Sequence, residues 1–165
     1  MFKTVQVFLF SIICTLSTQL AYSASVGDNA PSFRARTLNG SETISNSDLE
    51  GKVVFVDFWA SWCPPCLKSL PEFENLQTSF SGRDDVVVLA INLDENPKDA
   101  QKFVNNLRVT YKILEDKEGA IPESFGVNAM PTSYVIDKSG VIRYVHNGYK
   151  SGDVNKIKAE IEKLL

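Results

Sequence analysis

The sequence is poor in the residues that metal sites and disulfide frameworks require. Its 165 residues include three cysteines and one histidine, His146. Zinc is usually held by about four cysteine or histidine ligands, so this supply argues against a zinc site. A bridge between Cys63 and Cys66 would close so short a loop that it would restrict the unfolded chain very little. A zinc half-site and a purely structural disulfide are therefore the weaker interpretations of this pair.

The chain also lacks any lysine- or arginine-rich run, and its formal net charge is −3. A basic surface patch is the usual sign of a nucleic-acid-binding protein, so we expect no nucleic-acid partner. With 44% hydrophobic and 22% charged residues, the composition is that of an ordinary globular protein that can bury one substantial core. We expect a single domain and a monomer.

Residues 1–24 differ from the rest, because a basic start is followed by an apolar stretch over residues 5–16 and then by small residues. This order is typical of a secretory signal peptide. The apolar stretch is shorter than the roughly 20 residues that a membrane-spanning helix needs, so an uncleaved anchor is the weaker alternative. We therefore predict a signal peptide over residues 1–24, which takes Cys14 with it, and a periplasmic domain over residues 25–165.

The remaining sequence alternates between strand and helix patterns. Apolar and β-branched runs predict an edge strand over residues 33–38, strands over 52–58, 86–91 and 111–114, and a hairpin of 132–136 with 141–145. Apolar spacing predicts helices over residues 65–79, 99–107, 121–125 and 151–165, and residues 45–50 have a helical tendency. This order predicts an α/β domain with a mixed central sheet flanked by helices.

The chemistry is expected at Cys63 and Cys66, between the predicted central strand and the helix that follows it. Two thiols so spaced at a helix start can cycle between dithiol and disulfide, and the helix dipole and free amides there stabilise a thiolate. Cys63, nearer the helix N-terminus, is the expected nucleophile, and Cys66 is expected to resolve the mixed disulfide. A covalent haem site would need histidine directly after Cys66, where Leu67 stands.

Asp57 interrupts the apolar strand that precedes the cysteines. Burial there should raise the pKa of its carboxyl group, because desolvation disfavours the charged form. Such a group could accept the proton of Cys66 when the mixed disulfide is resolved, so Asp57 is a candidate catalytic residue. The alternative is a carboxylate that turns to solvent at the end of the strand.

The stretch VDFWASWCPPC over residues 56–66, with Met130-Pro131-Thr132 downstream, resembles the thioredoxin superfamily. It is most similar to the extracytoplasmic thiol-disulfide oxidoreductases of the TlpA, ResA and DsbE type. The resemblance extends over essentially the whole mature chain, from residues 27–33 to residues 140–142.

This resemblance implies a thioredoxin-like fold with an N-terminal hairpin and a helix-strand insert between Cys66 and Pro131. It also implies that Pro131 follows a cis peptide bond beside the disulfide and that the backbone of Met130 binds an extended substrate segment. Trp62 would cover the flank of the nucleophile, with a plain core aromatic as the alternative. Together with Thr132, these residues are the expected substrate-binding set.

One position departs from this pattern. Many similar proteins carry a glutamate on the active-site helix where this chain has Ser69, and their residue at the strand position of Asp57 is often asparagine. The acid has moved from helix to strand, as in thioredoxin itself. This change adds weight to Asp57 as the proton acceptor.

The sequence therefore predicts a thiol-disulfide oxidoreductase that acts on protein thiols or disulfides and needs no cofactor or metal. By resemblance, it is a reductant of extracytoplasmic cysteines, such as those of apocytochrome c before haem attachment, and a membrane-bound donor supplies its electrons. Two alternatives stay open. One is an oxidase or isomerase of secreted proteins, which differs in reduction potential. The other is a non-enzymatic binding module on the same fold.

Overall fold

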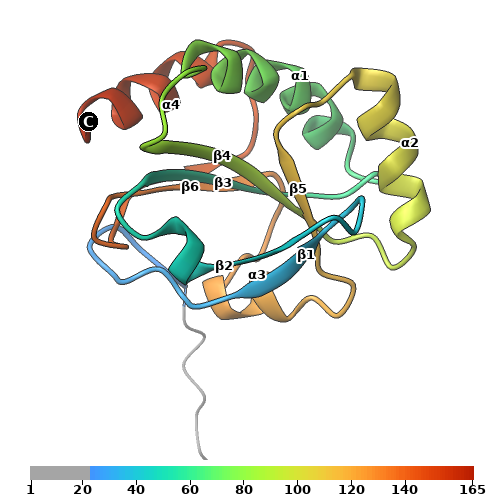
Figure 1. Ribbon diagram of the computed structural model, residues 1–165. Coiled ribbons are helices and arrows are strands. Elements are labelled where there is room, and N and C mark those ends of the chain that lie inside the picture. The colour runs from blue at the N-terminus through green and yellow to red at the C-terminus, as the bar shows by residue number, and fades with distance from the viewer. Residues whose placement is uncertain (1–22) are drawn as a thin grey trace, which may run out of the picture.

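A seven-stranded mixed sheet runs through the protein (Figure 1). The computed structural model describes residues 23–165. In their order across the sheet, the strands are β2 (Thr43–Ser45), β1 (Arg34–Thr37), β5 (Lys112–Glu115), β4 (Val86–Asn92), β3 (Val53–Trp59), β6 (Thr132–Ile136) and β7 (Ile142–Asn147). The helices are α1 (Pro64–Ser79), α2 (Pro97–Leu107), α3 (Ala120–Phe125) and α4 (Asp153–Glu162), with a short 3-10 helix, η1 (Asn46–Leu49).

The predicted strands and helices are confirmed to within a few residues at their ends, with one correction at the N-terminal side. β1 is not an edge strand, because β2 pairs with it on one side and β5 on the other, both antiparallel. The pattern did not reveal β2 because it has three residues, of which Ile44 alone is buried. β1 and β2 form the N-terminal hairpin that the resemblance implies.

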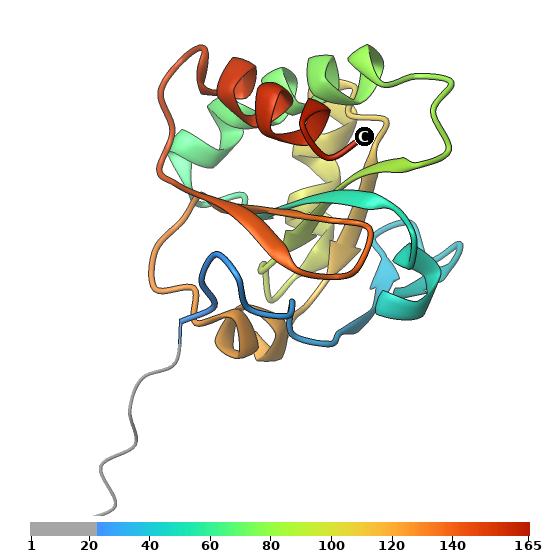
Figure 2. The same cartoon turned by 90° about the vertical axis from the view of Figure 1, so that its left-hand side faces the viewer.

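Helices cover both faces of the sheet, as Figures 1 and 2 show. α1, α2 and α4 lie on one face, and α3 and η1 lie on the other. Along β3, Phe55 and Trp59 belong to the buried cluster under α1, whereas Phe58 belongs to the cluster that includes Phe125 of α3. Because strand side chains alternate, Asp57 points into the layer under α1.

The direction of the central strands determines where the site forms. β3 is parallel to β4 and antiparallel to β6. The carboxyl ends of β3 and β4 therefore lie side by side, and α1 begins beyond the end of β3. α2 and β5 form the insert before β6, and β5 extends the sheet in parallel with β4. The predicted thioredoxin-like architecture is confirmed.

The predicted signal peptide lies outside the described residues except for Ser23 and Ala24, and it stays a prediction. Ala24 is buried, and its amide donates a hydrogen bond of 3.0 Å to the carbonyl oxygen of Phe125 at the end of α3. None of the helices described within residues 23–165 combines the length and apolar composition that a membrane crossing needs.

Candidate active site

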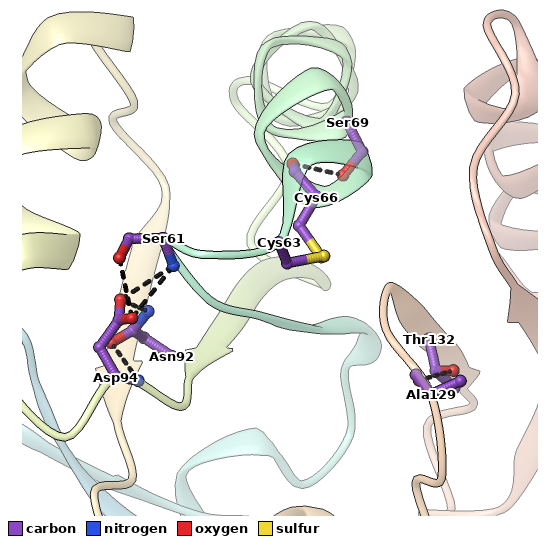
Figure 3. The surroundings of a disulfide bond; sticks show 8 residues. All are labelled: Ser61, Cys63, Cys66, Ser69, Asn92, Asp94, Ala129 and Thr132. Atoms are coloured by element: carbon purple, nitrogen blue, oxygen red, sulfur yellow. Dashed lines mark hydrogen bonds between the residues drawn. A yellow bond between two sulfur atoms is a disulfide. The ribbon is translucent and has the colours of Figure 1, made fainter.

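Cys63 and Cys66 form a disulfide at the N-terminus of α1 (Figure 3). Cys63 is the N-cap residue, Cys66 lies in the first turn, and their Cα atoms are 5.3 Å apart. Pro64 and Pro65 occupy the first helical positions, where the helix needs no amide donor. Cys63 is 6% exposed and Cys66 is 0% exposed. Cys63 is therefore the more accessible of the two cysteines.

A mostly apolar pocket of about 420 Å³ opens beside Cys63. The indole of Trp62 stands at this pocket and is 65% exposed, so the core-aromatic alternative for Trp62 is wrong. A large apolar side chain exposed next to a nucleophile is typical of a surface that contacts another molecule. The pocket is lined by Trp62, Cys63, Pro64, Pro65, Leu93, Val127, Asn128, Ala129 and Met130.

The loop between α3 and β6 forms the other part of this pocket. The Met130-Pro131 peptide bond is cis, as the resemblance implies, and Met130 lines the pocket. Thr132 is buried, and its hydroxyl donates a hydrogen bond of 2.8 Å to the carbonyl oxygen of Ala129 (Figure 3). The same hydroxyl donates to Oδ1 of Asn147 at 3.1 Å. Thr132 therefore anchors the loop to the sheet and is not among the lining residues.

Asp57 lies inside the sheet layer that α1 covers. It is 0% exposed, and neither carboxyl oxygen has a hydrogen-bond partner among residues 23–165. Burial raises the pKa of Asp57 well above its usual value, and the nearby amide of Phe58 opposes this by less. The alternative of a solvent-facing carboxylate is wrong. Cys66 belongs to the same buried cluster as Phe55 and Trp59, the neighbours of Asp57 on this face of β3.

A polar network that the sequence analysis did not identify holds the turn before the cysteines (Figure 3). The carboxylate of Asp94 accepts hydrogen bonds from the amide of Ser61 at 3.0 Å and from its hydroxyl at 2.9 Å. Nδ2 of Asn92 donates to the same carboxylate at 2.8 Å. Polar residues at the carboxyl end of a strand parallel to the central one were the available signal. The network fixes the chain from β3 to Cys63.

Ser69 is buried in the first half of α1, and its hydroxyl donates a hydrogen bond of 2.9 Å to the carbonyl oxygen of Cys66. The position at which similar proteins carry a glutamate therefore holds a neutral side chain that bonds within the helix. This leaves Asp57 as the buried carboxyl group on the sheet face that α1 covers.

The chain matches a known protein family. The profile of the family described as Redoxin matches residues 25–161. The chain belongs to the redoxin family. The thioredoxin-like protein YneN of Bacillus subtilis is 38% identical to this redoxin over 125 residues, which are 74% of this chain and 71% of YneN. The thiol-disulfide oxidoreductase ResA of Halalkalibacterium halodurans is 32% identical over 149 residues, which are 84% of each chain.

A solved structure supports the same assignment. A Chlorobium tepidum protein described as a thiol:disulfide interchange protein DsbE has a TM-score of 0.79 and 34% identity to this redoxin, over 86% of this chain and 99% of its own. This redoxin is therefore a thiol-disulfide oxidoreductase of the ResA and DsbE type with a thioredoxin-like fold.

We expect Asp57→Asn to remove a pH dependence from folding. Because the pKa of Asp57 is raised in the folded protein, the folded state keeps a proton that the unfolded chain releases above the usual value of 3.8. The free energy of unfolding should therefore fall as the pH rises through this window, by up to about 1.4 kcal/mol per pH unit for one group.

Urea unfolding of the oxidised protein between about pH 4 and pH 8 measures this effect. The difference in the free energy of unfolding between wild type and Asp57→Asn should change with pH. The difference between wild type and Asp84→Asn, which alters an exposed carboxyl group, should not. Parallel pH dependences for wild type and Asp57→Asn would contradict the cost assigned to the buried carboxylate.

Asp94→Ala should destabilise the protein, because it leaves the amide and hydroxyl of Ser61 without their acceptor. The expected loss in the free energy of unfolding is about 2 to 3 kcal/mol, typical of hydrogen bonds to a charged group. Ser61→Ala removes the hydroxyl and keeps the amide bond, so it should cost about 1 kcal/mol or less. Equal stabilities of the two variants in urea unfolding would show that the network does not hold the turn.

Proposed function

We propose that this redoxin is an extracytoplasmic reductant of disulfides in other proteins, with Cys63 and Cys66 as its redox pair. The observation that carries the proposal is the setting of Cys63, at the edge of a mostly apolar pocket beside the exposed indole of Trp62. Such a surface suits a polypeptide segment that presents its disulfide to the nucleophile. The predicted signal peptide supports the extracytoplasmic location.

The substrate segment is held by the loop between α3 and β6. The backbone of Met130, which lines the pocket next to Cys63, offers hydrogen-bonding groups to an extended chain. Pro131 lies in this loop beside the disulfide, Thr132 holds the loop through its hydrogen bonds, and the indole of Trp62 covers the flank of the nucleophile. These roles follow the family resemblance, and they fit the positions that the residues occupy.

The first step is attack by the Cys63 thiolate on one sulfur of the substrate disulfide. A bond forms between Sγ of Cys63 and that sulfur, the substrate disulfide breaks, and the other substrate sulfur leaves as a thiolate that takes a proton from water. Cys63 is suited to this step because it is the N-cap of α1, where the helix dipole and free amides stabilise a negative charge.

The second step releases the substrate. Asp57 accepts the proton of the Cys66 thiol, and Sγ of Cys66 attacks Sγ of Cys63. The Cys63–Cys66 disulfide forms, and the second substrate sulfur leaves as a thiolate that is protonated in turn. The substrate has gained two electrons and two protons, and the enzyme has lost them. The disulfide in the structure corresponds to this end state.

A reductant in an oxidising compartment must be reduced again after every turnover. We propose that a membrane-bound dithiol reductase supplies the electrons by thiol–disulfide exchange at Cys63, the more accessible of the two cysteines. By the family resemblance, the substrates include cysteines that must stay reduced, such as those of apocytochrome c before haem attachment.

A trapping experiment tests this assignment. Cys66→Ser keeps the nucleophile and removes the resolving thiol, so mixed disulfides should accumulate on Cys63 in the native host. Purification under non-reducing conditions and mass spectrometry should identify proteins of cytochrome c biogenesis. The variant in which both cysteines are serine is the matched control and should trap nothing. A broad set of secreted proteins would instead indicate an oxidase or isomerase.

The base role of Asp57 has its own test. The reduced protein is mixed in a stopped-flow instrument with an aromatic disulfide that releases a coloured thiolate, first on attack by Cys63 and again on resolution by Cys66. Asp57→Asn should slow the second phase by about 100-fold or more, the typical contribution of general base catalysis, and leave the first phase unchanged. An unaltered second phase would remove the base role.

A further inference from the structure

Three polar side chains in the core under α1 have no hydrogen-bond partner among the described residues. They are the carboxyl oxygens of Asp57, Nε1 of Trp59 and the hydroxyl of Tyr111. Asp57 and Trp59 are 0% exposed and Tyr111 is 5% exposed. Buried polar groups are nearly always hydrogen-bonded, so unpartnered groups on one face of the sheet require an explanation. They are complementary, since Tyr111 and Trp59 can donate and a carboxylate can only accept.

The register of the sheet places Tyr111 on the same face as Asp57. Ala90 of β4 pairs with Asp57 on one side and with Ile113 of β5 on the other. Tyr111 stands two residues before Ile113, and both belong to the buried cluster under α1. Between β3 and β5, Ala90 contributes only a methyl group at the level of Asp57, and Val88 lies one step back, at the level of Tyr111. The charge of Asp57 acts on the hydroxyl of Tyr111 across this space.

Helix α1 fixes the chain next to Tyr111. The carboxylate of Glu74 accepts hydrogen bonds from the amide of Thr110 at 2.6 Å and from its hydroxyl at 2.5 Å. The same helix carries Cys66. One element therefore positions both the resolving thiol and the backbone that leads into Tyr111.

We propose that Tyr111 is a positioning residue of this enzyme. In the disulfide form its hydroxyl and the Asp57 carboxyl group are not hydrogen-bonded to each other. In the reduced protein the hydroxyl donates a hydrogen bond to the Asp57 carboxylate and stabilises it as the acceptor of the Cys66 proton. The proposal rests on the proposed role of Asp57 in resolving the mixed disulfide. Tyr111 acts through Asp57 and does not touch the reacting sulfurs.

The chemistry of the two groups fits this arrangement. Burial raises the pKa of Asp57, which disfavours the carboxylate form that accepts the proton of Cys66. A donor to the charged form opposes that shift. Burial, together with the charges of Asp57 and Glu74, raises the pKa of Tyr111 well above its usual value. The phenol therefore keeps its proton and remains a donor throughout the working pH range.

β6 and β7 bring two further polar side chains to this face of the sheet. β6 places Ser133 opposite Asp57, and β7 places His146 opposite Ser133. Nε2 of His146 lies 3.1 Å from the carboxylate of Asp153 in α4. No lysine, arginine or histidine among residues 23–165 contributes to the pKa shift of Asp57. The titratable groups on this face are then Cys63 and Cys66 at the start of α1, His146 of β7 and Tyr111, and Glu74 of α1 acts on Tyr111.

Tyr111→Phe tests the proposal, because it removes the hydroxyl and keeps the ring. The titration of the Asp57 carboxyl carbon is followed by NMR in the reduced, full-length protein. Its midpoint should rise by about one pH unit, the effect of losing one hydrogen bond to a charged group. At a fixed pH below that midpoint, the resolving phase in the stopped-flow assay should be about tenfold slower than in wild type. The pH at which this phase reaches half its maximal rate should rise by the same amount as the Asp57 midpoint.

Tyr134→Phe is the matched control. Tyr134 is also a buried tyrosine, but it belongs to the cluster on the opposite face, and its hydroxyl donates to the carbonyl oxygen of Phe125 at 3.3 Å. It should leave the Asp57 titration unchanged. In an Asp57→Asn background, Tyr111→Phe should have no effect on the resolving phase, because the group it acts through is gone.

An unchanged Asp57 midpoint in Tyr111→Phe would overturn the proposal, and so would a shift produced by Ser133→Ala in its place. A merely structural hydroxyl without a partner would leave the midpoint unchanged, and its removal would stabilise the protein. The NMR titration reads Asp57 directly, so it decides the role of Tyr111 even if Asp57→Asn leaves resolution unaltered. Unaltered resolution in Asp57→Asn would argue only against the base role of Asp57, and it would leave the hydrogen bond from Tyr111 untouched.

Discussion

Burial in an apolar core destabilises the charged form of a carboxyl group, and in this redoxin that group is Asp57 of the central strand, which has no hydrogen-bond partner among residues 23–165. Both faces of β3 must be covered for this burial, which α1 achieves on one side and α3 on the other. The same packing brings the N-terminus of α1 to the end of β3. The packing of α1 and α3 against β3 therefore both buries the Asp57 carboxyl group and places the two thiols at the end of the strand.

The site is assembled from segments that are distant in sequence. α1 contributes the two cysteines, the turn after β4 contributes Asp94, and the loop before β6 contributes Met130 and a cis-Pro131. Each segment is fixed by bonds of its own: the Ser61 amide to Asp94, and the Thr132 hydroxyl to the backbone of its loop. A substrate that enters the pocket therefore meets a surface that is already formed.

Local patterns were sufficient for the elements that bury many apolar side chains. β3, β4, α1 and the β6–β7 hairpin follow from apolar runs, helical spacing and turn residues, and the cysteine spacing identified the redox pair. β2 was missed because one buried residue is too little signal. Other features depend on how separate strands align, and no single segment of sequence encodes that alignment. They are the exposure of Trp62, the hydrogen bonds of Asp94 and the interaction of Tyr111 with Asp57.

The complete burial of Cys66 has a consequence for the lifetime of the enzyme–substrate complex. A polypeptide can be held covalently on Cys63 alone, since the second sulfur is out of its reach. Release then requires the hidden Cys66 thiol to lose its proton inside the protein, and the pKa of the departing substrate thiol also contributes to the rate. Every bound chain would be released through the same buried thiol, whatever its sequence.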